Sequence, residues 1–194
     1  MIRPLAFAAA ILISAPATAQ DSRIAPGDYQ RLVEFERHFG GAMLQALSGG
    51  APADIASLVR ALSGPALEGD LTGDWKCRVM KLGGLTPLTV YTFFRCRVTE
   101  TADGNLLLEK LSGSQLTRGR IVPSEGSLVY LGVGYIAGAE PITYEAYHAG
   151  DIPASAGQVT SDVGFVELIS DRRARVLFPA PMLESDFDVL ELTR

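Results

Sequence analysis

The sequence predicts a mainly β fold of the α+β class, in which an N-terminal helical hairpin packs on an antiparallel up-and-down β-barrel or rolled sheet of about eight strands. Two observations support this. Apolar residues recur at helical spacing between residues 26 and 62, and short runs rich in β-branched and aromatic residues follow from residue 71 onward. Sequential hairpins are typical of barrels and sandwiches, and pairing of the last strand with the first would remove the exposed edges.

Residues 1–19 have the pattern of a signal peptide. Arg3 supplies the positive charge, residues 5–13 the apolar core, and Ala17-Thr18-Ala19 the small-residue cleavage motif. The apolar run is shorter than the about 20 residues that a membrane-spanning helix needs. We therefore expect cleavage after Ala19 and a periplasmic protein without a membrane span, whose residues 20–25 form a loose tail.

Residues 26–64 are expected to form the helical hairpin. Pro26 suits a first helical turn, and an apolar stripe continues from there until Gly49-Gly50 ends the first helix. The second helix runs from Pro52 to Leu62. One apolar face on this pair must dock on another part of the protein, so the hairpin and the antiparallel β domain of residues 65–194 should form one structural unit.

Eight runs in the β domain alternate between apolar and polar residues, with Gly-, Pro- and Ser-rich turns between them. A loop rich in small residues is predicted over 138–157. Glycines inside the strand patterns at 119, 132, 134 and 164 indicate bulges, bends or close backbone approach. The predicted strands are 72–80, 88–99, 105–111, 115–123, 128–136, 159–169, 174–178 and 187–193.

Cys77 and Cys96 are the only cysteines, and in an exported protein such a pair indicates one disulfide. Two buried free thiols are the alternative. If the two cysteines lie directly opposite each other, Val79 faces Phe94 and all four side chains share the apolar face. A bond across this loop would contribute about 3 kcal/mol in the chain-entropy model.

The same register places four cations on the other face, with Lys76 opposite Arg97 and Arg78 opposite Arg95. Like charges that face each other across a sheet are destabilising, so these residues need acidic neighbours or an anionic ligand. Neutralisation on a solvated face is one interpretation, and an anion-binding patch is the other. The acidic candidates in adjoining strands are Glu109, Asp188 and Glu191.

The formal net charge is −5, and it becomes −6 after removal of Arg3 with the signal peptide. Nucleic acids and anionic membranes attract basic surfaces, so an acidic chain argues against either as a main partner.

No catalytic motif stands out, and we expect neither a metal nor a cofactor. Of the two histidines, His38 lies in a predicted helix and His148 in the long loop. Glu145 or Asp151 could orient the His148 ring, but no nucleophile is evident beside it. We therefore predict that the protein is not an enzyme and keep a hydrolase site around His148 as a minor hypothesis.

Several segments of the chain resemble an exported bacterial family, domain of unknown function 4893. They are WKCRVMKLGG, YTFFRCR, KLSGSQLTRGRIVP, VYLGVGY and LESDFDVLEL. The resemblance implies a signal peptide, an N-terminal helical part and a β-rich part that contains cysteine, and it implies no activity. Gly73-Asp74-Trp75 also resembles the Gly-x-Trp opening of lipocalin-like barrels, in which a basic residue covers the Trp; Arg194 is the candidate cover.

These observations predict a non-catalytic periplasmic protein that binds a small apolar or amphipathic ligand in or beside the barrel. The candidate apolar lining is Trp75, Phe94, Tyr130 and Phe165. The alternative is a protein-interaction module, such as an inhibitor of an envelope protease or an assembly factor, which would bind a periplasmic protein. Secreted metalloprotease inhibitors are similar small Gly-x-Trp barrels whose N-terminal segment enters the protease.

Overall fold

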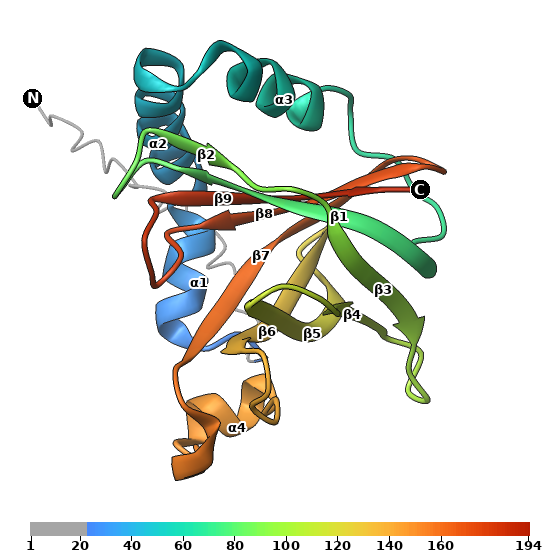
Figure 1. Ribbon diagram of the computed structural model, residues 1–194. Helices are drawn as coiled ribbons and strands as arrows, with labels where there is room; N and C mark the ends of the chain where they lie inside the picture. Colours follow the sequence, from blue (N-terminus) through green and yellow to red (C-terminus); the bar gives the residue numbers. More distant parts are fainter. Residues whose placement is uncertain (1–22) are drawn as a thin grey trace, which may run out of the picture.

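The computed structural model describes residues 23–194, so the predicted signal peptide lies outside the described residues (Figure 1). Eight strands form a closed antiparallel barrel in which each strand pairs with the next, and β9 pairs with β1 to complete the ring. The predicted fold class is therefore confirmed. The barrel strands are β1 (Gly73–Leu82), β3 (Phe94–Glu100), β4 (Leu106–Lys110), β5 (Gln115–Ser124), β6 (Ser127–Ile136), β7 (Val159–Ser170), β8 (Arg173–Pro179) and β9 (Phe187–Thr193).

The predicted strand 88–99 is divided in two. A short strand, β2 (Leu88–Val90), pairs with the second half of β1, whereas β3 pairs with its first half. Residues 91–93 interrupt the ladder between them, although the Tyr91 amide still donates a hydrogen bond to the Val79 carbonyl. β2 is thus a ninth strand on the edge of the closed barrel.

The disulfide between Cys77 and Cys96 is confirmed, but the register predicted around it is wrong by two residues. Trp75 lies opposite Cys96, and Cys77 lies opposite Phe94. The bond therefore runs diagonally across the β1–β3 pair, with 5.8 Å between the Cα atoms. A shift of two residues keeps every side chain on its face, because side chains alternate with a period of two, so the apolar pattern cannot distinguish these registers.

Inward-facing apolar residues fill most of the barrel, including the end where β1 begins. Trp75 is buried there, and its indole N–H donates to the Leu71 carbonyl at 2.8 Å. Tyr130 crosses the interior and is fully buried. Gly119 and Gly132 make room for its ring, since a Cβ at either position would lie within 2.7 Å of it, which confirms close approach at these two glycines.

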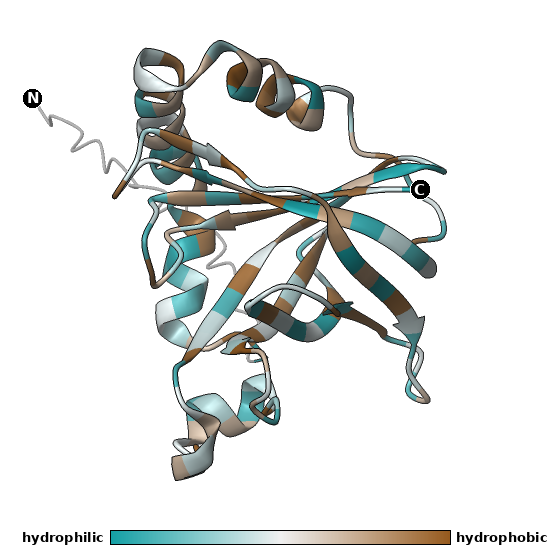
Figure 2. Ribbon diagram, viewed as in Figure 1, coloured by the Kyte–Doolittle hydropathy of each residue, from teal (hydrophilic) through white to brown (hydrophobic). Residues whose placement is uncertain are grey.

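The helices cover the outside of the barrel, and apolar and polar residues alternate along its strands (Figure 2). The predicted first helix divides at Glu34 into α1 (Pro26–Val33) and α2 (Phe35–Gly49). α1 packs on β7, whereas α2 packs on β1, β8 and β9 with Phe35 and Phe39 against Phe187.

α3 (Pro52–Leu62) has the predicted bounds and lies beside β2. Two guanidinium groups from β8 hold its C-terminal end. Arg173 donates to the Arg60 carbonyl, and Arg175 donates to the carbonyls of Ala61 and Gly64, both at 3.2 Å. Cations satisfy unpaired carbonyls at a helix C-terminus and interact favourably with its dipole.

The connection predicted as a loop over 138–157 contains a short helix, α4 (Tyr144–Ala149), and a 3₁₀ turn, η1 (Ala154–Ala156). Thr143 caps α4 by accepting a hydrogen bond from the Ala146 amide. The end of the predicted tail docks here: Ile24 is buried, and the Ala25 amide donates to the Tyr144 hydroxyl. Within residues 23–194, none of the helices has the length and apolar character to cross a membrane.

Candidate functional site: a polar cavity at one end of the barrel

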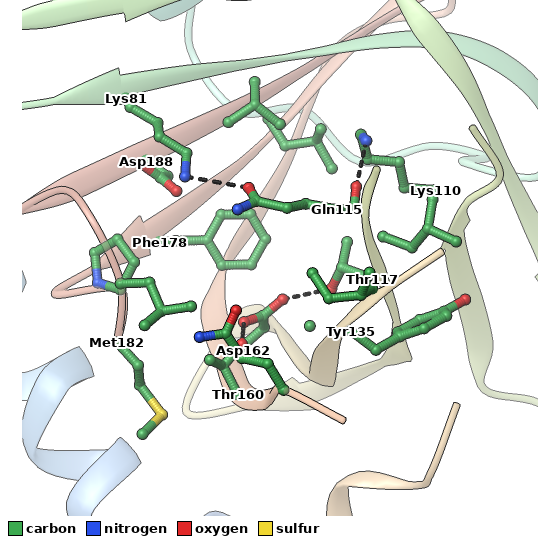
Figure 3. Close-up of a pocket in the computed structure, with 18 of the residues that line it drawn as sticks. Lys81, Lys110, Gln115, Thr117, Tyr135, Thr160, Asp162, Phe178, Met182 and Asp188 are labelled. Atoms are coloured by element: carbon green, nitrogen blue, oxygen red, sulfur yellow. Dashed lines mark hydrogen bonds between the residues drawn. The ribbon is translucent and has the colours of Figure 1, made fainter. Parts of the chain in front are cut away.

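A cavity of about 120 Å³ occupies the end of the barrel opposite Trp75 (Figure 3). It lies where β1, β6 and β8 end and where β5, β7 and β9 begin. An engineered cavity of about 150 Å³ in another protein holds benzene, so this space suits a molecule of roughly that size. Its lining residues are Arg31, Val79, Lys81, Lys110, Gln115, Leu116, Thr117, Gly134, Tyr135, Ile136, Gln158, Thr160, Asp162, Phe178, Pro181, Met182, Leu183, Asp188 and Leu190.

The cavity is apolar on its floor and at its rim. Phe178 and Leu190 project from the packed interior and form the floor. At the rim, Ile136, Met182 and Leu183 are large apolar side chains that remain exposed to solvent by 36–54 %. An amphipathic molecule could therefore contact apolar groups both inside the cavity and at its mouth.

Two lysines line the cavity wall between these apolar parts. Lys110 is buried: its ammonium donates to the carbonyls of Ser112 and Gln115 and lies 4.0 Å from the centre of the Phe94 ring. Burial and then the charge of Lys81 lower the pKa of Lys110 to about 8. Lys81 forms a 2.5 Å ion pair with Glu184 and donates to the Gln115 side chain at 3.3 Å.

Two aspartates face the same space. Asp162 accepts hydrogen bonds from Thr117 at 2.6 Å and Thr160 at 3.1 Å, and burial raises its pKa in spite of them. Asp188 accepts from Ser185 at 2.6 Å, and burial raises its pKa to about 7. The Asp162 carboxylate sits over Gly134, where a Cβ would lie 3.0 Å from its nearer oxygen.

Sequence reasoning missed most of this site. Asp188 was expected to neutralise outward-facing cations, but it faces the interior next to Lys81. A signal was present, because the alternation that turns Trp75, Cys77 and Val79 inward also turns Lys81 inward. This alternation predicts that charged residues near the strand ends face the barrel interior.

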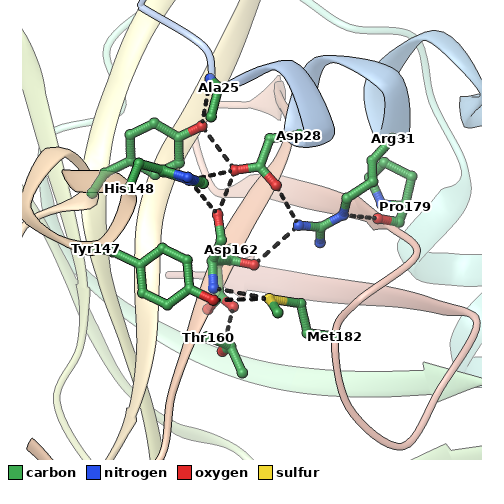
Figure 4. Close-up of polar contacts among 11 residues, drawn as sticks. Ala25, Asp28, Arg31, Tyr147, His148, Thr160, Asp162, Pro179 and Met182 are labelled. Atoms are coloured by element: carbon green, nitrogen blue, oxygen red, sulfur yellow. Dashed lines mark hydrogen bonds and ion pairs between the residues drawn. The ribbon is translucent and has the colours of Figure 1, made fainter. Parts of the chain in front are cut away.

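A second polar cluster joins α1, α4 and β7 beside the cavity (Figure 4). One oxygen of the buried Asp28 accepts from Tyr144 at 2.8 Å, from Ser161 and from His148 Nε2 at 2.9 Å. Its other oxygen pairs with Arg31 at 2.8 Å. Burial acts to raise the pKa of Asp28, but the hydrogen bonds from Ser161, Tyr144 and Arg31, together with the Arg31 charge, outweigh it and hold the pKa below its usual value.

The Asp28 cluster contains Ser, His and Asp without the geometry of a catalytic triad. His148 Nε2 contacts both Asp28 and Ser161, the latter at 3.2 Å, and Ser161 itself donates to Asp28. In a triad the two ring nitrogens contact different partners, so that the proton of the serine can move to the histidine. The arrangement fastens α1 and α4 to the barrel.

The structure does not bring together the loop residues proposed around His148. Glu145 pairs with Arg120, and Asp151 lies exposed after α4. The carboxylate that contacts His148 is that of Asp28, which is 120 positions away in the chain. Among the described residues there is no group of three or more His, Cys, Asp or Glu side chains arranged to hold a metal.

The four aromatic residues proposed as a ligand lining lie outside the cavity wall. Trp75 is at the opposite end, under the guanidinium of Arg194, whose Cζ lies 4.1 Å from the ring centre. Phe94 lies under Lys110, and Tyr130 bonds to Thr117 within the core. Phe165 points outward and packs edge-on against Phe35 of α2.

The four cations of the proposed anion patch are partly neutralised. Arg78 pairs with Glu191 at 2.6 Å, and Arg97 pairs with Asp74 at 2.6 Å. The corrected register places Lys76 opposite Arg95. Together with Arg97 and Arg194, Lys76 and Arg95 border a second pocket of about 420 Å³ beside Trp75. Of the expected acidic neighbours, Glu191 pairs with Arg78, and Glu109 lies opposite Arg97 in the β3–β4 ladder while it also pairs with Arg118.

Comparison with known proteins complements this geometry. No curated protein and no solved structure matches the chain. One family model, described as Domain of unknown function (DUF4893), matches residues 21–192. Because this match includes the helices, the whole barrel and both cysteines, the chain belongs to the DUF4893 family.

Proposed function

We propose that this protein is an exported, non-catalytic binding protein that holds a small amphipathic ligand in the barrel cavity. The observation that carries the proposal is a cavity at the open end of a closed barrel with apolar floor and rim and polar groups on its wall. Ligand sites are typically concave and mostly apolar, with a few polar groups that fix orientation.

Export to the periplasm forms part of the proposal. The signal-peptide pattern of residues 1–19 and the Cys77–Cys96 disulfide support it, because disulfides persist in oxidising compartments. The non-catalytic role is supported by the Asp28 cluster, where the serine hydroxyl donates to a carboxylate and is not aligned for attack.

Native mass spectrometry of the protein purified from the periplasm, with the disulfide intact, tests the binding role. We expect an adduct of small mass that disappears on denaturation. Val79→Phe should abolish it, because the larger side chain projects into the cavity. Val59→Phe, on the exposed side of α3, makes the same chemical change away from the cavity and should retain the adduct.

A protein with no adduct, or an adduct that Val79→Phe leaves unchanged, would contradict the proposal. It would favour a protein partner instead. Crosslinking in the periplasm would then identify the partner.

A further inference from the structure

The ammonium groups of the two cavity lysines already donate hydrogen bonds to other groups of the protein. An ammonium group has three donors. Those of Lys110 are directed at two carbonyl oxygens and at the face of Phe94, and Lys81 donates to Glu184 and Gln115. Arg31 is similarly occupied, by Asp28 and by the carbonyls of Pro179 and Ser161. The cations on the wall therefore offer few donors to a ligand.

The aspartates of the cavity have spare acceptor capacity. A carboxylate can accept about four hydrogen bonds. Asp162 receives two from hydroxyl groups and Asp188 receives one. Among residues 23–194, neither carboxylate forms an ion pair, although the charge of Arg31 acts to lower the pKa of Asp162 and the charge of Lys81 acts to lower that of Asp188. Burial of a carboxylate without a paired cation is costly, so both groups would gain from a cationic partner.

Asp162 and Asp188 both line the cavity, and the charge of Asp162 acts to raise the pKa of Asp188. The ring of Phe178 lines the same space, and Figure 3 shows it between the two aspartates. A cation attracts both carboxylates and the face of an aromatic ring. Two carboxylates and one ring around a small cavity are a chemical match for an ammonium group.

We infer that the ligand is a small organic ammonium ion, with its charged nitrogen at Asp162 and Asp188 beside Phe178 and its apolar body directed toward the rim. This inference rests on the proposed function and specifies the ligand class. Ile136, Met182 and Leu183 would contact the apolar body. A cavity of about 120 Å³ suits a body of about four or five carbon atoms.

Three probes of matched size test the charge preference: n-butylammonium, 1-butanol and butyrate. Each is titrated into the ¹⁵N-labelled protein with the disulfide intact, and amide shifts of cavity residues are followed by NMR. At about pH 8 Asp188 is ionised, because its pKa is about 7. We expect n-butylammonium to bind at least about tenfold more tightly than 1-butanol, and butyrate to bind most weakly.

Asp162→Asn should lower the affinity for n-butylammonium at least about tenfold and leave the affinity for 1-butanol unchanged. Asp188→Asn provides the same test at the second carboxylate. Asp151→Asn is the matched control, because Asp151 is exposed and lies outside the cavity. All four proteins are first compared by their amide spectra, so that only folded variants enter the comparison.

The outcomes separate the two proposals. If 1-butanol or butyrate binds at the cavity as tightly as n-butylammonium, or if neither aspartate variant weakens the ammonium, the ligand class is wrong and cavity binding stands. If no probe shifts cavity residues and the native protein carries no adduct, the binding function itself is contradicted.

Discussion

Asp188 should make the stability of this barrel depend on pH in a direction opposite to that of most aspartates. Its pKa is about 7 in the folded protein against a usual value of 3.8. The folded state therefore binds this proton more tightly than the unfolded chain does. The resulting stability is fully present below about pH 4 and is lost as the pH rises to about 7.

Asp188→Asn removes this dependence, since the amide carries no charge at any of these pH values and can still accept from Ser185. A pKa difference of about 3 corresponds to about 4 kcal/mol in the free energy of unfolding. About 1 kcal/mol of that is already lost at pH 4.5. Between about pH 4.5 and pH 8, the variant should therefore gain about 3 kcal/mol relative to the original protein.

Urea unfolding of the ligand-free proteins at a series of pH values measures this difference, because the midpoint and slope give the free energy at each pH. Asp151→Asn, an exposed aspartate, should show no such trend. A difference between Asp188→Asn and the original protein that stays constant with pH, or that moves in the opposite direction, would refute the reasoning.

Three further changes test the packing. Replacement of Cys77 and Cys96 by Ala should lower the free energy of unfolding by about 3 kcal/mol in urea, and reduction of the original protein should have the same effect. Gly132→Ala should lower the free energy of unfolding by at least about 2 kcal/mol, because the new Cβ would lie 2.5 Å from the ring of the buried Tyr130. Gly41→Ala, which has open space around it in α2, should raise the free energy of unfolding by up to about 1 kcal/mol. Thermal unfolding of the two variants measures this difference. Arg194→Ala should expose the only tryptophan and shift its fluorescence to longer wavelength, and an unchanged spectrum would contradict the covering role of Arg194.

The sequence was sufficient to predict most strands and the faces of the first pair, but not the register of that pair, the break at residues 91–93 or the inward position of Asp188. Alternation places Trp75, Cys77 and Cys96 on one face in the predicted register and in the observed one. The observed register also places Asp74 opposite Arg97, which replaces one repulsive pair with an ion pair. The apolar pattern does not distinguish the two registers, but charge complementarity between the strands does favour the observed one.

The cavity was harder to foresee because its polar residues come from separate strands. Lys110, Asp162 and Asp188 each look like an ordinary charge at a strand end, and only closure of the barrel gathers them around one space. The Asp28 cluster depends in the same way on tertiary packing, since His148 meets a partner from α1. Periodic patterns within a short stretch of sequence contain no information on contacts between residues that are far apart in the chain.

Barrel closure has a consequence for the order of folding. Most barrel contacts join consecutive strands and can form locally, whereas the seam between β1 and β9 joins the two ends of the β domain and carries the largest entropic cost of loop closure. Lys81 lies directly opposite Asp188 across that seam. The cavity therefore does not exist until the seam forms, and any molecule bound there would stabilise the closed ring over the open one by mass action. Ligand concentration would then control how often this seam opens, which amide hydrogen exchange along β1 and β9 would measure.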